Sequence, residues 1–249
     1  MRIIVCENYE AVSRKAAQMI LSQITLKPNS VLGLATGSTP IGMYKNLIQM
    51  NKEGVVDFSE VKTFNLDEYY NLPRTNDQSY YYFMHDNLFN HININPANVQ
   101  IPNGMTSDVE AECDRYDASI KKAGGIDIQV LGIGNNAHIG FNEPTVNFEK
   151  GTHLVQLDDS TIEANARFFV SKDEVPKQAV TMGVGSIFKS KKIMLIACGE
   201  AKAEAIYNTV YGKVVPEVPA SILQFHNDIV LILDKAAAKL LNKEDYKTA

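Results

Sequence analysis

The sequence of 249 residues has no tryptophan, only three cysteines, and no apolar run near the roughly 20 residues that a membrane-spanning helix requires. Cys6, Cys113 and Cys198 are widely spaced and form no CxxC pair, which argues against a disulfide framework and against a zinc site. Glycine and proline are scarce, with 15 and 9 residues, which argues against a low-complexity chain. These absences favour a folded protein of the reducing cytoplasm with buried, reduced thiols.

Positive charge is not in excess either. The chain carries 24 Lys and Arg against 29 Asp and Glu, a net charge of −5 with a pI near 5.6, so it lacks the basic surface of a nucleic-acid-binding protein. Arg2 is followed by only three apolar residues before Cys6 and Glu7, which predicts a strand rather than a signal peptide. We therefore expect neither a nucleic acid nor a membrane as a partner.

Short apolar runs rich in β-branched residues alternate with longer amphipathic segments. The runs that we predict as strands are Ile3–Val5, Val31–Ala35, Val61–Leu66, Ile126–Ile133, Ile193–Ala197 and Ile229–Leu233. Helical spacing is found around Ala11–Leu21, Met43–Ile48, Ala201–Tyr207 and Ala236–Leu241, and the aromatic run Tyr80–Phe83 is interpreted as the packed face of another helix. Strands that are apolar at consecutive positions are covered on both faces, which is typical of a parallel sheet between two layers of helices. With no linker and no repeat, we predict one α/β domain over residues 1–249.

Residues 142–176 differ from this pattern. They are rich in Thr, Asn, Asp and Glu and show weak periodicity. Long irregular segments within a domain often have a functional role. We predict that this segment is a lid or an inserted excursion.

Chemically distinctive turns follow four of the predicted strands. They are Thr36-Gly37-Ser38-Thr39-Pro40, Asp67-Glu68-Tyr69, the stretch from Gly134 to Pro144, and Gly199-Glu200-Ala201-Lys202. In a parallel sheet, ligands bind at the carboxyl ends of the strands. These turns are therefore the candidate site.

The first turn begins a predicted helix, with Ser38 or Thr39 as its N-cap. Two interpretations stay open, a capped helix start without a ligand, or a phosphate held by free backbone N–H groups that Gly37 allows to approach. Lys202 is either a solvated helix lysine or a residue of the site.

The other candidates also have two interpretations each. Asp67 either caps a turn or acts as a base whose pKa burial raises. His138 either lies on a surface loop or pairs with Glu143 for proton transfer. Arg167 is a helix surface arginine unless the predicted lid makes it an anion clamp. The motif Gly132–Ala137 matches a dinucleotide fingerprint, but it lies mid-chain and not at the first strand, so we reject NAD binding.

Taken in order, these turns resemble the glucosamine-6-phosphate deaminase (isomerising) family. Further blocks that carry the resemblance are Ala164-Asn165-Ala166-Arg167-Phe168-Phe169, Val180-Thr181-Met182-Gly183 and Pro219-Ala220-Ser221-Ile222-Leu223-Gln224. The resemblance runs nearly end to end. It implies a Rossmann-like three-layer αβα sandwich with a mainly parallel sheet, related to ribose-5-phosphate isomerase and 6-phosphogluconolactonase. It also implies conversion of glucosamine 6-phosphate to fructose 6-phosphate and ammonia, in amino-sugar catabolism, without a cofactor or a metal.

The resemblance implies a role for each candidate. Asp67 would move a proton from C2 to C1 of the sugar, and His138, tied to Glu143, would open the pyranose ring. The substrate phosphate would be held by a set of five residues: Gly37, Ser38, Thr39, Arg167 and Lys202.

The sequence departs from the family pattern at two places. Many members carry Asp two residues before the histidine, where this chain has Asn136, which cannot take a proton and is expected to orient His138 or the sugar. Allosteric hexameric members have basic and hydroxyl residues after the Asn-Glu-Pro turn, where this chain reads Val146-Asn147-Phe148-Glu149-Lys150. We therefore expect no activation by N-acetylglucosamine 6-phosphate, and either a monomer or a homo-oligomer.

Two alternatives stay open. A 6-phosphogluconolactonase-type hydrolase would use the same fold and a histidine but no C2 base, so Asp67 discriminates between them. A sugar-phosphate-sensing regulator would carry a DNA-binding helix-turn-helix before the first strand, and this chain begins at a strand.

Overall fold

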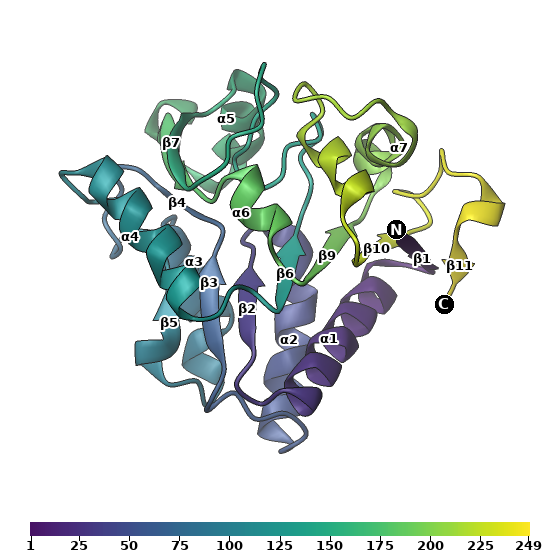
Figure 1. Cartoon of the computed structure of the whole chain (residues 1–249), viewed down its shortest axis with the longest axis horizontal. Coiled ribbons are helices and arrows are strands. Elements are labelled where there is room, and N and C mark those ends of the chain that lie inside the picture. Colours follow the sequence, from purple (N-terminus) through teal and green to yellow (C-terminus); the bar gives the residue numbers. More distant parts are fainter.

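Eight strands form one wholly parallel sheet in the computed structural model, which describes residues 1–249 (Figure 1). Its strands are β1 (Arg2–Cys6), β2 (Val31–Leu34), β3 (Lys62–Asn65), β5 (Val99–Gln100), β6 (Ile128–Leu131), β9 (Lys192–Ala197), β10 (Ile229–Asp234) and β11 (Lys247–Thr248). Their order across the sheet is β11-β1-β10-β9-β6-β2-β3-β5. All six apolar runs predicted as strands form strands, and the predicted parallel sheet is confirmed.

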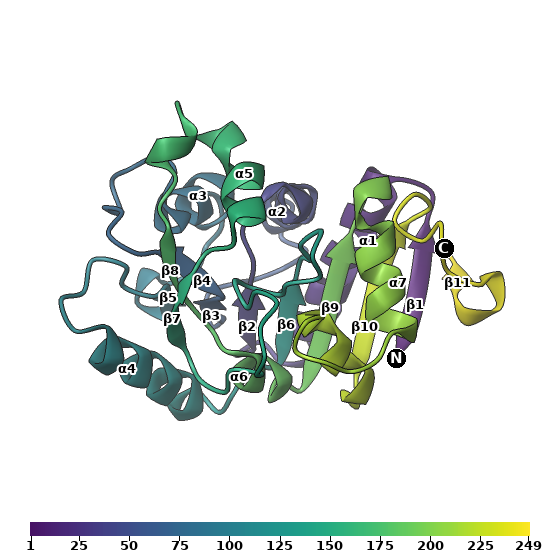
Figure 2. The same ribbon diagram turned by 90° about the horizontal axis from the view of Figure 1, so that it is seen from above.

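Helices cover both faces of this sheet. The α-helices are α1 (Tyr9–Leu26), α2 (Ser38–Lys52), α3 (Tyr80–Asn87), α4 (Val109–Lys122), α5 (Asp159–Asn165), α6 (Val184–Phe188) and α7 (Ala203–Tyr211). The 3₁₀ helices are η1 (Phe89–His91), η2 (Pro96–Asn98), η3 (Ala166–Phe168), η4 (Lys172–Glu174), η5 (Glu200–Lys202), η6 (Pro219–Phe225) and η7 (Lys243–Asp245). Seen from above, α1, α2 and α3 lie on one side of the sheet and α4 and α6 on the other (Figure 2). The three-layer sandwich is confirmed.

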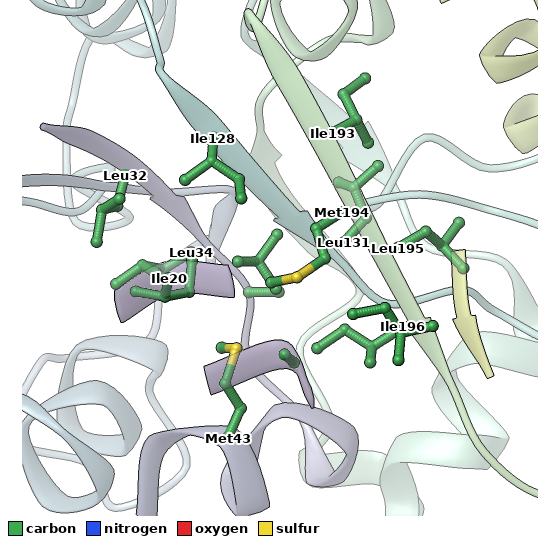
Figure 3. Close-up of a cluster of buried hydrophobic side chains, with 14 of the residues drawn as sticks. Ile20, Leu32, Leu34, Met43, Ile128, Leu131, Ile193, Met194, Leu195 and Ile196 are labelled. Carbon is green, nitrogen blue, oxygen red and sulfur yellow. The ribbon is translucent and has the colours of Figure 1, made fainter. Parts of the chain in front are cut away.

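The core fills the space between the central strands and these helices. Figure 3 shows Leu32 and Leu34 of β2, Ile128 and Leu131 of β6 and the run Ile193–Ile196 of β9, which belong to one buried cluster together with Ile20 of α1 and Met43 of α2. Burying one such aliphatic side chain contributes about 1.5–3 kcal/mol. The strands β2, β6 and β9 are therefore firmly held, and so are the starting points of the turns that follow them.

A second, antiparallel sheet has the order β4-β8-β7 and consists of β4 (Asp67–Tyr69), β8 (Gln178–Thr181) and β7 (His153–Gln156). It has a small core of its own, built around Tyr69, Phe141 and Ile162. In Figure 1, α5 and β7 lie beyond the end of the large sheet toward which β3 and β6 point. The segment 142–176, expected to be irregular, contains β7, α5, η3 and η4. Its weak periodicity reflects short elements, not an absence of structure.

One predicted helix is absent. Residues 235–240 form turns in place of a helix over Ala236–Leu241. The carboxylate of Asp234 accepts hydrogen bonds from the backbone N–H groups of Ala237 and Gly199. In addition, a six-residue segment is too short to form a helix that is stable by itself. The chain then returns as β11, which covers the free edge of β1. No helix has the length and apolar character needed to cross a membrane.

Candidate active site

A cavity of about 450 Å³ opens at the carboxyl ends of β9, β6, β2 and β3, which are neighbours in the large sheet. The turn after each of these strands contributes to its lining. The contributing predicted residues are Gly37, Ser38 and Thr39 after β2, Asp67 after β3, Asn136 and His138 after β6, and Lys202 after β9. Helix α5 and η3 form a further wall that includes Arg167. Glu143 is not part of the lining but bonds to His138. The structure therefore brings all nine predicted site residues together.

The turn after β2 leaves an open helix N-terminus in the cavity. Gly37 is the N-cap of α2, with φ +93°, and no side chain caps the helix, so the prediction of Ser38 or Thr39 as N-cap is wrong. A φ in this range favours glycine, which places the cap one residue earlier. The backbone N–H groups at the start of this 15-residue helix therefore have no capping side chain. Ser38 and Thr39, at the same helix start, both line the cavity.

Two cations line this end of the cavity. Lys202 follows Gly199, which has φ +91°, and Arg167 extends from η3. Neither forms an ion pair with a carboxylate, and burial together with the charge of Arg167 lowers the pKa of Lys202. Two cations beside an open helix N-terminus are groups suited to hold an anion.

Asp67 is the first residue of β4 and is only 5% exposed. Burial, followed by the charge of the neighbouring Glu68, raises the pKa of Asp67 to about 8. A Cβ atom placed on Gly140 would lie 3.6 Å from Asp67 Oδ2, so the Asp67 carboxyl lies near the loop that carries His138. Such a carboxyl is suited to accept and return a proton near neutral pH.

His138 and Glu143 form a hydrogen-bonded pair. His138 Nδ1 lies 3.1 Å from Glu143 Oε2, and the Asn136 amide donates to the same oxygen at 2.9 Å. Burial raises the pKa of Glu143, but the hydrogen bond and charge of His138 outweigh it, and the net pKa is lowered. An ionised Glu143 accepts a hydrogen bond from the Nδ1–H group of His138, which leaves Nε2 free for proton exchange with a ligand.

The loop that holds this pair is tightly curled. Ala137 has φ +65° and Gly140 has φ +59°, and the Gly134 N–H donates to the His138 carbonyl at 3.0 Å. A Cβ atom on Gly134 would lie 2.5 Å from the His138 ring. A buried alanine in the left-handed region costs about 1–2 kcal/mol, and such strain is concentrated at functional sites.

Several residues of the site were missed by the sequence analysis. Tyr80, interpreted only as a packing residue, lines the cavity and stacks on Phe141 with ring centroids 5.9 Å apart. Glu68 is buried and accepts the backbone N–H groups of Tyr69, Tyr80 and Tyr81. Thr161 lines the wall from α5. Only Glu68 carried a signal, because a second carboxyl group beside a candidate base is unusual at the end of a buried strand.

A second hollow, of about 740 Å³, lies beside β5 and α4. Its lining includes Arg115, which is bound to Glu112 at 2.6 Å, and Arg74, which lies over the Tyr81 ring. It contains no histidine and no aspartate, and thus no acid–base pair comparable to that of the first cavity. No group of three or more His, Cys, Asp or Glu side chains is placed to hold a metal ion.

The model of the family of glucosamine-6-phosphate isomerases and 6-phosphogluconolactonases matches residues 7–231. The chain belongs to this family. Named relatives include a glucosamine-6-phosphate deaminase of Clostridium botulinum (strain Eklund 17B / Type B), 71% identical over 247 residues, 99% of each chain. Another, from Clostridioides difficile (strain 630), is 64% identical over the same share of both chains.

Solved structures of the family have the same fold. A structure described as a monomeric glucosamine-6-phosphate deaminase superposes with a TM-score of 0.94 and 44% identity, covering 96% of this chain and 100% of that one. The 6-phosphogluconolactonase of Trypanosoma cruzi has a TM-score of 0.75 at 20% identity, covering 97% of each chain. The second likeness shows the fold alone. This chain is therefore more similar, in both sequence identity and TM-score, to that deaminase than to that lactonase.

Proposed function

We propose that the protein converts glucosamine 6-phosphate and water to fructose 6-phosphate and ammonia. Relatives at 64% and 71% identity carry the name of this activity. The observation that carries the proposal is the placement of Asp67 in one cavity with the separate His138–Glu143 pair. An aldose–ketose conversion of a ring-closed sugar needs two such proton-transfer groups.

The substrate phosphate binds at the end of the cavity formed by the start of α2, η5 and η3. Lys202 and Arg167 supply the positive charge, and the Ser38 and Thr39 hydroxyls with the N–H groups after Gly37 supply donors. A phosphate dianion would neutralise two cations that have no carboxylate partner, which explains why both are placed there.

Ring opening belongs to the histidine pair. In the pyranose form, C1 is not a carbonyl and the C2 proton is not acidic, so the ring must open first. His138 moves the proton between O1 and the ring oxygen through Nε2, while Glu143 holds its Nδ1 proton. Asn136 donates to Glu143 and accepts the His138 backbone N–H at 3.2 Å, so its role is orientation.

Isomerisation and loss of nitrogen follow at Asp67. Its carboxylate takes the C2 proton of the open-chain aldehyde while one proton passes from the 2-ammonium group to O1, which leaves an enolamine. The same carboxyl then returns its proton to C1. The product is a C2 imine, to which water adds before ammonia leaves. Atoms balance with one water consumed, and no cofactor enters the scheme.

The proposed reaction needs no partner beyond the sugar phosphate and water, and we propose that the enzyme acts in the cytoplasm. It is tested by incubating the purified protein with glucosamine 6-phosphate and measuring ammonia and fructose 6-phosphate together. We expect equal amounts of both. Hydrolysis of 6-phosphogluconolactone without ammonia release would instead assign the lactonase activity.

A further inference from the structure

The wall of the cavity contains a hydroxyl that the proposed mechanism does not use. Thr161 lies on α5 and is only 4% exposed, although its side chain is polar. Its Oγ1 atom lies 3.5 Å from His138 Nδ1, and the Thr161 hydroxyl is one of the polar groups beside Glu143 that lower the pKa of that carboxyl. Thr161 thus contacts both members of the pair from a different element.

The hydrogen bonds of Glu143 are unevenly distributed. Its Oε2 atom accepts from both His138 and Asn136, whereas its Oε1 atom is buried and has no partner. A buried carboxylate oxygen without a donor is costly. The His138 Nδ1 proton already points to Oε2, so the Thr161 hydroxyl is the donor beside the pair that has a proton to give.

The same short segment carries two further contacts of the site. One helical turn after Thr161, Asn165 donates to the Tyr69 hydroxyl at 3.0 Å, two residues along β4 from Asp67. Two residues later, Arg167 supplies one of the two cations that line the cavity. Residues 161–167 therefore connect the phosphate end of the cavity to both proton-transfer groups.

We propose that Thr161 is a positioning residue that aligns the His138–Glu143 pair for ring opening. Through Thr161, the segment that binds the substrate phosphate at Arg167 also sets the geometry of the pair. This inference rests on the proposed function. Its consequence is that the hydroxyl serves turnover and not affinity.

The test compares four proteins by steady-state ammonia release from glucosamine 6-phosphate. Thr161→Val keeps the shape of the side chain and removes the hydroxyl, and Thr161→Ser restores it. Glu163→Gln is the control, because Glu163 is on the same helix but is exposed and pairs with Lys172 outside the cavity. We expect Thr161→Val to lose kcat on the order of 10-fold with little change in KM. Thr161→Ser and Glu163→Gln should remain near the wild type.

A binding measurement separates alignment from damage to the pocket. The reduced open-chain analogue, a 2-amino-hexitol 6-phosphate, needs no ring opening. Thr161→Val should bind it as tightly as the wild type does, measured by calorimetry. A loss of analogue binding that parallels the loss of kcat would assign Thr161 to the pocket wall and overturn the proposal.

The outcomes distinguish this inference from the proposed function. If the wild type releases no ammonia, the proposed function fails. If the wild type is active and Thr161→Val has the same kcat as Glu163→Gln, the inference fails while the function stands. Should Thr161→Val not fold, Thr161→Ala and Thr161→Ser take its place, and equal kcat values for these two would contradict the inference.

Discussion

Asp67 and Glu68 are adjacent carboxyl groups with different surroundings. Both are buried, but the Glu68 carboxylate accepts three backbone N–H groups, whereas no hydrogen bond or cation lowers the pKa of Asp67. Burial raises the pKa of Glu68 only to about 7 because those bonds oppose it, and raises that of Asp67 to about 8. Glu68 is thereby suited to hold structure and Asp67 to exchange protons.

Replacing Asp67 by Asn should leave the fold intact and abolish most of the activity. The amide has nearly the same shape but cannot take the C2 proton, and loss of a general base costs about 10²–10⁴ in rate. The measurement is ammonia release, with circular dichroism to verify folding. A folded Asp67→Asn protein with near wild-type turnover would contradict the mechanism, whereas retained lactone hydrolysis would favour a lactonase.

The same carboxyl makes stability and activity respond to pH in opposite directions. The pKa of Asp67 is raised from 3.8 to about 8 on folding, so between these values the folded state holds a proton that the unfolded chain has lost. Stability therefore falls as pH rises through this window, while kcat/KM rises as the base ionises. We expect Asp67→Asn to melt above the wild type at pH 8, and the difference to shrink toward pH 5. A pH-independent difference would contradict the raised pKa.

At the scale of elements, the site depends on helices that begin directly after strands. Gly37 and Gly199 have φ values of +93° and +91°, and nothing lies within 4 Å of a Cβ atom placed on either. Backbone conformation, and not crowding, therefore requires glycine at both turns. The turns bring the start of α2 and Lys202 to the same end of the cavity.

Removing either cation should weaken substrate binding more than turnover. In the proposed mechanism, Lys202→Ala and Arg167→Ala each remove a contact to a phosphate that does not react, worth about 1.5–3 kcal/mol for a hydrogen bond to a charged group. We expect KM to rise about 10- to 100-fold, with a smaller loss of kcat from poorer alignment. Lys239→Ala is the matched control, because Lys239 is exposed and pairs with Glu200 on η5. An unchanged KM in both cavity variants would place the phosphate elsewhere.

Glu68 connects β4 to the start of α3. Glu68→Gln should lower the free energy of unfolding by about 1–3 kcal/mol, because the amide nitrogen cannot accept the N–H groups that the carboxylate accepts. It should also shift the acid limb of kcat/KM to lower pH, because the charge of Glu68 raises the pKa of Asp67. Urea denaturation and a pH–rate profile measure the two effects. An unshifted limb would show that burial alone sets the pKa of Asp67.

At the scale of the whole molecule, the parallel sheet was predictable because consecutive apolar residues mark strands that are covered on both faces. The residue types in the turns after the strands then predicted that the candidate residues lie together at the carboxyl ends of those strands. The small sheet was not predictable, because β4 is only three residues long and begins with Asp67 and Glu68. The placement of Tyr80 and Thr161 in the cavity wall follows from tertiary packing, which leaves no local pattern in the sequence.

The surface after the Asn142-Glu143-Pro144 turn bears on regulation of the whole molecule. An activator acts only through different affinities for two states of the protein, so it needs a site that holds its phosphate in one of them. Here Val146 is 78% exposed and Lys150 is an exposed cation without an ion-pair partner. His153 follows in β7, with Nδ1 3.0 Å from the Gly151 carbonyl oxygen. One exposed lysine and one histidine are a poor lining for a dianion.

We therefore expect no appreciable activation by N-acetylglucosamine 6-phosphate. Initial rates measured against glucosamine 6-phosphate should follow a hyperbola, and saturating activator should leave both kcat and the shape of the curve unchanged. Light scattering on the same sample gives the number of chains, which matters because a neighbouring chain in an oligomer would add cations that a single chain lacks. A sigmoidal curve that becomes hyperbolic when the activator is added would show that a regulatory site exists. A simple hyperbola from a monomer would agree with a chain whose only phosphate site is the one at Gly37, Arg167 and Lys202.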